Sequence, residues 1–169
     1  MKIIVCGCGK IGSAIIEKLS EEGHDVIVID KEQAVVTEIA NIHDVMGVVG
    51  NCADCETLED AGVAEAELFI AVTGSDEMNM LSCFLAKRMG AGATIARIRT
   101  PEYNDASLDF MKRELGLSMA INPELMAARE LFDLLKLPSA AKVEAFARRA
   151  FEVVELKLRE NSPLDGYAL

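Results

Sequence analysis

Short runs of aliphatic and β-branched residues alternate along this chain with amphipathic stretches that repeat with the period of a helix. The runs predict strands at residues 2–6, 25–29, 45–49, 68–72, 94–98 and 118–121. The stretches between them predict helices at residues 10–22, 33–41, 55–61, 76–89 and 105–115, and four of these helices end at a glycine. This alternation predicts an α/β fold with a doubly wound, parallel, six-stranded sheet.

The predicted order of the elements also sorts the polar loops between the two edges of the sheet. Right-handed crossovers place the residues after each strand at the carboxyl edge, where open α/β sheets bind ligands. This edge holds residues 7–12, Asp30, residues 51–54, residues 73–76, residues 97–103 and Asn122. Both histidines, His24 and His43, fall in helix-to-strand turns at the opposite edge, so we expect them to be turn residues without a ligand role.

A glycine motif, GCGKIG from Gly7 to Gly12, lies directly between the first predicted strand and the first predicted helix. Gly7 permits a tight turn, Gly9 allows a diphosphate to approach the backbone, and Gly12 allows the helix to pack closely on the sheet. The helix presents its unpaired N–H groups to the phosphates. In this context the motif predicts a Rossmann-type dinucleotide site; a glycine turn that serves packing alone is the alternative.

Asp30 ends the second predicted strand, roughly 20 residues after Gly12. A carboxylate near this spacing binds ribose hydroxyls in dinucleotide sites, and it would repel the 2′-phosphate of NADP. The adjacent Lys31 weakens this repulsion without reversing it. Asp30 therefore argues against NADP, while a plain N-cap for the following helix is its alternative role.

Two small polar segments follow the third and fourth predicted strands. They contain Asn51 and Cys52, and Thr73 and Gly74. Small residues at the carboxyl edge let an adenosine lie across it and let backbone N–H groups donate to a ligand. Asp54 and Ser75 in these segments are equally suited to N-cap the helices that follow.

Two arginines alternate with apolar residues along the fifth predicted strand. Arg97 and Arg99 therefore lie on one face of a strand that should be central in the sheet. An arginine inside a core strand is costly unless it is paired. We expect the two side chains either to reach a ligand phosphate and an acidic neighbour, or to bridge a subunit interface; a solvated edge is the simpler alternative.

The predicted carboxyl edge lacks the residues of a hydride-transfer enzyme. Such an enzyme needs a proton donor beside the nicotinamide, and Tyr103 has no lysine four residues later. We therefore predict that the chain is not an enzyme, with the cofactor domain of an NAD-dependent dehydrogenase as an alternative.

Cys8, Cys52 and Cys55 suggest a second alternative, a redox-sensing NADH switch. A zinc site would need these cysteines to converge across a strand, and we predict no metal site.

The last third of the chain departs from the strand and helix alternation. Asn122 and Pro123 predict a helix start, and the helix continues over residues 125–137 with apolar residues on more than one face. A second subunit, or burial within the chain, would cover the extra face.

Residues 143–147 and 151–158 predict a β-hairpin. We expect a nucleotide-binding domain at 1–121, a crossover helix and connecting strand at 122–150, and the start of a truncated C-terminal domain at 151–169.

Composition and charge narrow the range of partners. The 169 residues are 51% hydrophobic and 27% charged, which is typical of a globular protein with its own core. The formal net charge of −11 would repel a phosphate backbone, so nucleic acid is a poor partner. No apolar run reaches the roughly 20 residues of a membrane helix. The five cysteines then predict free thiols in a cytoplasmic protein.

Several segments of the chain share a pattern that goes beyond the glycine motif. They are residues 2–12, Asp30, residues 50–52, residues 71–80, residues 96–103 and residues 122–124. Together these segments resemble the nucleotide-binding RCK (or KTN) domains of TrkA-like regulatory subunits in Trk-type potassium uptake systems. AVTGSDEMNM and ARIRTPEY are the most specific segments, because they separate this family from other dinucleotide-binding proteins.

The resemblance implies a cytoplasmic regulator, peripheral on the inner face of the cell membrane and not inserted in it. Such a regulator binds NAD(H) or ATP/ADP, assembles as homodimers or higher rings, and gates a membrane-embedded potassium transporter through ligand-dependent changes in oligomer geometry. The helix after Asn122 would form the dimer contact. The resemblance implies a role for each of the following residues: Gly7, Cys8, Gly9, Lys10 and Ile11 at the phosphates with Gly12 closing the motif, Asp30 at the ribose with Lys31 beside it, Asn51 and Cys52 at the adenine, Thr73 and Gly74 at the far side of the diphosphate, and Arg97 reaching the ligand.

Overall fold

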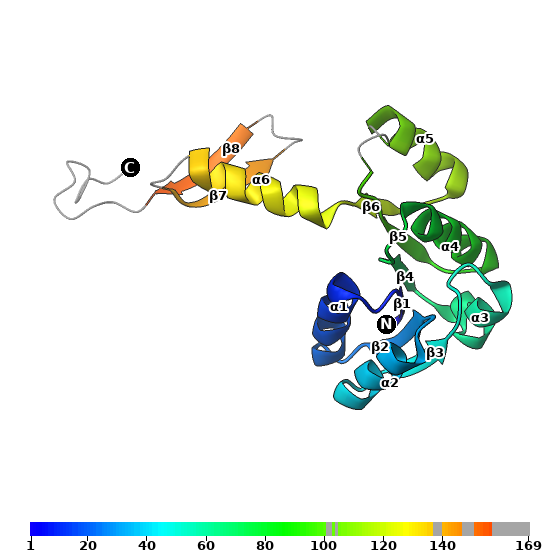
Figure 1. The fold of residues 1–169 in the computed structure, drawn as a ribbon. Helices are drawn as coiled ribbons and strands as arrows, with labels where there is room; N and C mark the ends of the chain where they lie inside the picture. The colour runs from blue at the N-terminus through cyan, green and yellow to red at the C-terminus, as the bar shows by residue number, and fades with distance from the viewer. Residues whose placement is uncertain (101–102, 104, 137–139, 147–150, 157–169) are drawn as a thin grey trace, which may run out of the picture. The chain divides into compact units, whose positions relative to one another are not determined.

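The computed structural model describes residues 1–100, 103, 105–136, 140–146 and 151–156 (Figure 1). The chain separates into two compact units, Met1–Asn122 and Pro123–Leu169. The first contains a sheet with helices packed on it, and the second contains one helix and a hairpin in its described part. No helix in the described ranges combines the length and the apolar character that crossing a bilayer requires.

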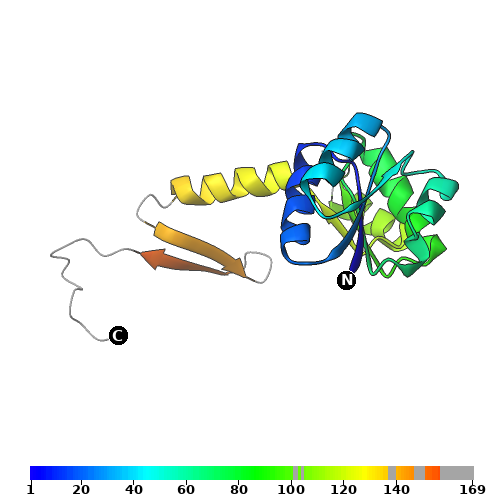
Figure 2. The same cartoon turned by 90° about the horizontal axis from the view of Figure 1, so that it is seen from below.

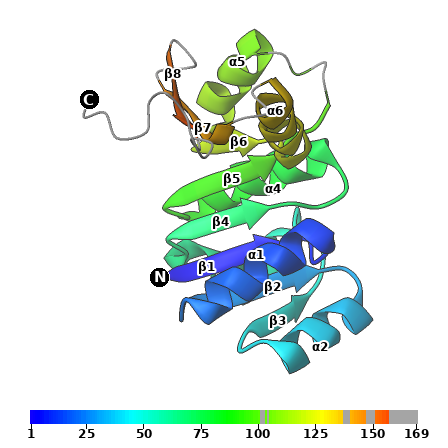
Figure 3. The ribbon, with the colours of Figure 1, turned by 90° about the vertical axis from the view of Figure 1, so that its left-hand side faces the viewer.

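The first unit is built on a single sheet in which all paired strands are parallel. The strands are β1 (Lys2–Cys6), β2 (Asp25–Asp30), β3 (Met46–Val49), β4 (Leu68–Ala71), β5 (Ala93–Arg97) and β6 (Met119–Ile121). Their order across the sheet is β3-β2-β1-β4-β5-β6 (Figure 3). The chain thus winds outward from β1 in both directions, which confirms the predicted doubly wound sheet of the Rossmann type.

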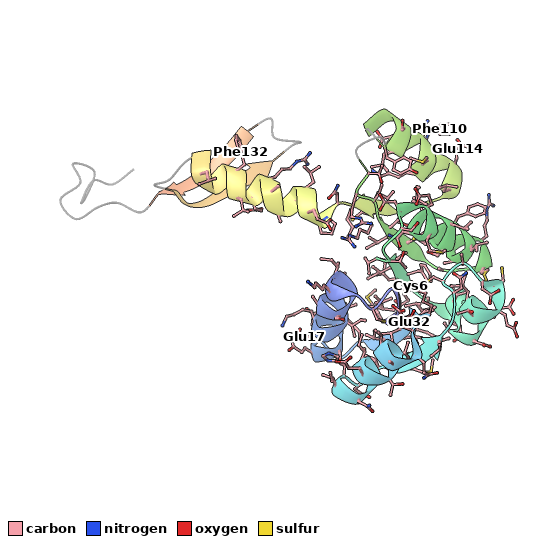
Figure 4. The ribbon with its side chains drawn as sticks, in the orientation of Figure 1. Cys6, Glu17, Glu32, Phe110, Glu114 and Phe132 are labelled. Carbon is pink, nitrogen blue, oxygen red and sulfur yellow. The ribbon has the colours of Figure 1, made fainter. Side chains whose placement is uncertain are left out.

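Helices cover the two faces of this sheet. They are α1 (Lys10–Glu21), α2 (Gln33–Ile42), α3 (Cys55–Asp60), α4 (Asp76–Met89) and α5 (Asp105–Leu115), with a short 3₁₀ turn η1 (Val63–Glu65). Alternate residues of β1 enter separate cores, because successive strand side chains point to opposite faces. Ile3 and Val5 pack with α1 and α2, whereas Ile4 and Cys6 pack with α3 and α4. Figure 4 labels Cys6 within this second core.

The predicted elements are confirmed with small differences at their ends, where the regular hydrogen bonding of an element stops. Four glycines end helices in the left-handed region, with φ values of 75° at Gly23, 68° at Gly62, 120° at Gly90 and 67° at Gly116. These are the positions that the sequence marks as helix stops. The difference that matters most is at β5, which ends at Arg97 rather than at residue 98. Arg99 therefore lies in the loop beyond the strand.

The second unit consists of α6 (Pro123–Lys136) and an antiparallel hairpin of β7 (Ala140–Phe146) and β8 (Phe151–Leu156). α6 lies against β7 (Figure 2). The helix start at Pro123 and the hairpin are confirmed, although β7 begins three residues before its predicted start because Ala140 pairs with Leu156 across a bulge. Predicted positions 137, 147–150 and 157–169 lie outside the described residues, and the three-part domain division stays a prediction.

α6 carries a large exposed apolar surface. Leu131 and Phe132 are each 62% exposed, and Leu135 is 77% exposed (Figure 4 labels Phe132). A helix of a globular protein normally turns one apolar stripe toward its core and presents polar residues elsewhere. The described residues of a single chain therefore leave part of the apolar surface of α6 uncovered.

Candidate functional site

The glycine loop between β1 and α1 is packed tightly on its sheet side and open at Gly9. Gly7 has a φ of 93°, and a Cβ there would lie 2.8 Å from the Thr73 backbone nitrogen. A Cβ on Gly12 would overlap the Gly7 carbonyl oxygen. A Cβ on Gly9, in contrast, would meet no described atom within 4 Å. Two of the glycines therefore serve close backbone packing, and the third borders open space.

α1 begins directly after Gly9, which is its N-cap residue. Within the described part of the chain, no side chain caps this end of the helix and no acidic residue lies in its first turn. The Ser13 hydroxyl donates to the Cys8 carbonyl at 3.0 Å and holds the turn. Uncapped N–H groups at a helix N-terminus, with the exposed Lys10 beside them, suit an anionic group such as a phosphate.

Asp30 lies at the end of β2, in contact with the glycine loop. Its Oδ2 accepts the Cys8 N–H at 2.7 Å, and its Oδ1 accepts the Glu32 N–H at 3.1 Å. Each oxygen has a second lone pair that a ribose hydroxyl can use. The N-cap of α2 is Glu32, so the alternative role of Asp30 as that N-cap is wrong. Lys31 is exposed, and its ammonium lies 3.9 Å from Glu32 Oε1.

The segment after β3 reaches the same edge, since the Gly50 N–H donates to the Asp30 carbonyl at 3.0 Å. Asn51 is exposed, and its Oδ1 accepts the Ala53 N–H at 3.0 Å. Cys52 is only 5% exposed, with its side chain in the core beside Cys6. Asp54 caps α3 by accepting the Thr57 N–H at 2.9 Å, which confirms its N-cap role. The resemblance assigns Cys52 to the adenine, but the thiol of Cys52 is buried in the core.

The loop between β4 and α4 is held by Asn79, a side chain with no exposed surface. Asn79 Oδ1 accepts both the N–H of Thr73 at 2.8 Å and its hydroxyl at 2.7 Å. Asn79 Nδ2 donates to the Arg97 carbonyl at 2.9 Å. Ser75 accepts the Met78 N–H at 3.2 Å, which confirms Ser75 as the N-cap of α4. A Cβ on Gly74 would meet no atom within 4 Å among the described residues, so this loop also borders open space.

Asp76 binds the segment that follows β5. This carboxylate is 3% exposed, and its Oδ2 accepts the N–H groups of Arg99 and Thr100 at 2.8 Å each and the Thr100 hydroxyl at 2.7 Å. Arg99 Nε lies 3.5 Å from Asp76 Oδ1. Burial opposes ionisation of Asp76, but the hydrogen bonds from Thr100 and Arg99 outweigh it and hold its pKa below the ordinary value. Asp76 is thus the acidic neighbour that the arginine pattern predicts, at least for Arg99.

The structure brings most of the predicted binding residues to one edge, and it adds two residues that the sequence did not single out. Gly7, Asp30 and Thr73 are linked through direct contacts around the glycine loop. Asp76 and Asn79 position the second loop and were missed. Both lie on the buried stripe of α4 together with Met80 and Cys83. Polar residues on an otherwise apolar helix stripe are the pattern that indicates such a role.

The cysteines do not gather at the open edge. Cys6 and Cys83 are fully buried core residues. Burial, followed by the charge of Asp30, raises the pKa of Cys8 to about 12. The hydrogen bond from Cys6 lowers the pKa of the Cys52 thiol. Cys55 is exposed. Across the described residues, no group of three or more cysteine, histidine or acidic side chains is arranged to hold a metal ion.

The strand order, the glycine loop and the carboxylate at the end of β2 define a Rossmann-type domain. Comparison with known proteins then gives the family: the TrkA-N domain model matches residues 3–123, and the chain belongs to this family. This confirms the resemblance found in the sequence.

Curated relatives carry the same family name. The chain is 37% identical to the Trk system potassium uptake protein TrkA homolog of Archaeoglobus fulgidus, and the match covers 100% of this chain and 38% of the relative. It is 30% identical to the homolog of the same name in Methanothermobacter thermautotrophicus, over 100% of this chain and 81% of the relative. The chain therefore spans less than half of the first relative and most of the second.

Solved structures share the fold. The TrkA-N domain of the Escherichia coli inner membrane protein ybaL matches with a TM-score of 0.69 at 24% identity, over 79% of this chain and 96% of that one. The GsuK channel bound to NAD matches with a TM-score of 0.60 at 22% identity, over 71% and 21%. The AMP-bound Kef CTD of Shewanella denitrificans matches with a TM-score of 0.65 at 18% identity, over 83% and 84%.

Proposed function

We propose that this chain binds an adenine nucleotide, NAD(H) or ATP/ADP, at the carboxyl edge of its sheet and so regulates a membrane-embedded potassium transporter from the cytoplasmic side. The observation that carries the proposal is the Asp30 carboxylate, held at 2.7 Å by the Cys8 N–H beside the open position at Gly9. The names of the relatives, which are potassium uptake proteins, support the transporter as partner. The NAD and AMP in the titles of the structural neighbours support the ligand class.

The residues at the edge fit such a ligand. The diphosphate would lie at Gly9 and the N-terminus of α1, where Lys10 adds a positive charge. The ribose hydroxyls would bind Asp30, which also disfavours NADP. The adenine would lie toward Asn51 and the backbone at Cys52. The far side of the diphosphate would face Thr73 and Gly74, and Arg97 would reach the ligand. The net charge of −11 would repel a phosphate backbone, which argues against nucleic acid as a partner.

Regulation would act through assembly. The exposed apolar residues of α6 suit contact with a second copy of the chain, in a homodimer or a larger ring. A nucleotide shifts such an assembly between two geometries only if it binds one of them more tightly. Different nucleotides with different preferences would then send opposite signals to the transporter.

A regulator fits the edge better than a dehydrogenase does. Hydride transfer requires a group that donates or accepts a proton close to the nicotinamide. Both histidines lie between a helix and the next strand, at the opposite edge: His24 after α1 and His43 after α2. The dehydrogenase alternative therefore has no histidine at the place where the chemistry would occur.

Calorimetric titration of NAD and ADP into the full chain tests the proposal, with light scattering to follow oligomer size. We expect Asp30→Ala to weaken binding by about 10-fold to 100-fold, because hydrogen bonds to a charged group are lost. Asp25→Ala is the matched control, since Asp25 begins the same strand at the opposite edge and the change in charge is identical. Equal affinity of both variants and the wild type, or no binding at all, would contradict the proposal.

A further inference from the structure

Arg99 connects the candidate site to the end of the first unit. Its guanidinium Nη2 donates to the Gly74 carbonyl at 2.5 Å, in the loop that borders the open edge. Its own backbone carbonyl accepts from Asn122 Nδ2 at 3.3 Å. Asn122 is the last residue of the first unit and directly precedes α6. One residue therefore contacts the proposed nucleotide site with its side chain and the junction before α6 with its backbone.

Asp76 holds Arg99 in this position. Its Oδ2 accepts the Arg99 N–H at 2.8 Å, and its Oδ1 lies 3.5 Å from Arg99 Nε. Because Asp76 is almost fully buried, the position of its carboxylate is set by the packing of α4. The Arg99 side chain, in contrast, is 40% exposed. One carboxylate therefore links the backbone of Arg99 to its guanidinium, and the exposed guanidinium can exchange its Gly74 partner for another.

The present partner of that guanidinium at the edge is a neutral acceptor. Gly74 offers a carbonyl oxygen, whereas a nucleotide at the open edge would offer phosphate oxygens with a full negative charge. Arginine binds phosphate more strongly than it binds a carbonyl, since its planar fork matches two phosphate oxygens and the hydrogen bonds are charge-assisted. A bound phosphate near Gly74 would therefore compete for Arg99.

We infer that Arg99 couples phosphate binding at the Gly74 loop to the junction at Asn122, with Asp76 as its positioning residue. The inference rests on the proposed function, because it needs a phosphate-bearing ligand at this edge. In the structure, Arg99 donates to the Gly74 carbonyl. With ligand, Arg99 donates to the phosphate, and the change is passed through the Arg99 carbonyl to Asn122 and the start of α6. Adenosine, which has no phosphate, would bind without this effect.

Hydrogen exchange of the full chain with ADP, NAD or adenosine tests the coupling. In the wild type, ADP and NAD should each change exchange in peptides that cover residues 122–130, and adenosine should leave these peptides unchanged. Arg99→Gln removes the charge and should bind ADP about tenfold more weakly. When this variant is saturated with ADP, hydrogen exchange in the peptides that cover residues 122–130 should stay unchanged. Arg113→Gln, an exposed arginine in α5, is the control for charge and should behave like the wild type.

Asn122→Asp separates the coupling from binding. Aspartate caps a helix as well as asparagine does, so the start of α6 is preserved, but it has no side-chain N–H to donate to Arg99. We expect this variant to bind ADP with the affinity of the wild type and to lose the exchange change at residues 122–130. A purely structural link would instead lower stability and leave the ligand-dependent change intact.

The outcomes distinguish the two proposals. If neither NAD nor ADP binds the wild type, the proposed function fails and the coupling fails with it. If ADP binds but residues 122–130 do not respond, or respond equally in Arg99→Gln and Asn122→Asp, the coupling is wrong and the proposed function stands. An equal response to adenosine would also overturn it, because the phosphate would then have no part in the change.

Discussion

The loops after β1 and after β4 lie at the same edge of the sheet, yet they are held in opposite ways. In the first, Gly7 and Gly12 bring backbone against backbone, and no side chain stands between them. In the second, the buried side chains of Asn79 and Asp76 bind the loop to the last residue of β5 and to the residues that follow it. The first arrangement leaves a helix N-terminus open for a ligand. The second connects the edge to residues distant in the sequence, so the two loops are held by different chemistry.

The largest effect should follow from adding one methyl group to the first loop. Gly12→Ala would place a Cβ on the Gly7 carbonyl oxygen, and backbone atoms have no room to move away. We expect a loss of about 3 kcal/mol in the free energy of unfolding, measured by chemical denaturation. Gly9→Ala serves as the control, because open space surrounds that position. Equal stability of the two variants would show that the first loop is not held by backbone packing.

A smaller loss should follow from changing the second loop. Asp76→Asn replaces a buried acceptor of three hydrogen bonds with an amide that faces the same donors, and we expect about 2 kcal/mol of destabilisation at pH 7. Asp109→Asn is the control. Asp109 is 69% exposed and lies 3.7 Å from Lys112, so its loss should cost less than about 0.5 kcal/mol.

The dependence on pH sharpens this prediction. The pKa of Asp76 lies below its ordinary value, so the ionised group stabilises the folded state above about pH 4. The stabilisation is lost as the pH falls through the lowered pKa of the folded state. The difference between the wild type and Asp76→Asn should therefore be constant from neutral pH to about pH 4 and shrink below it. A constant difference at all pH values would mean that the carboxylate charge has no part in holding Arg99.

The smallest effect concerns binding rather than stability. Gly9→Ala leaves the fold intact, since Gly9 has a φ of −69° and its Cβ would enter open space. That space is where the diphosphate is proposed to approach the backbone, so we expect about a tenfold loss of ADP affinity by calorimetry. An unchanged affinity together with unchanged stability would move the phosphate away from this loop.

The same contrast explains how much of the molecule the sequence predicts. The first loop is encoded by neighbours in the chain, because the glycines and the strand and helix around them form one local pattern. The N-caps at Asp54 and Ser75 and the glycine helix stops are local as well, and the structure confirms them. The carboxylate at the end of β2 follows from the sheet topology, which the alternation of strands and helices predicts.

The side-chain hydrogen bonds that hold the second loop were not predicted, because their partners are distant in sequence. Asp76 and Asn79 bind backbone groups of residues near the end of β5, 18 to 24 positions away. Their place on the buried stripe of α4 indicates a structural role, but nothing local shows which backbone groups they bind. The alternation around Arg97 and Arg99 predicted a common face, but the strand ends between them. Cys52 likewise lies within a polar segment, and only the packing of the core shows that its thiol is buried beside Cys6.

A crystal structure of the full chain grown with NAD would show where the nucleotide binds. We expect the diphosphate against Gly9 and the first turn of α1, with the adenosine ribose hydroxyls bound to Asp30. NAD bound at any other place, or a diphosphate on the loop with no contact between the ribose and Asp30, would contradict it.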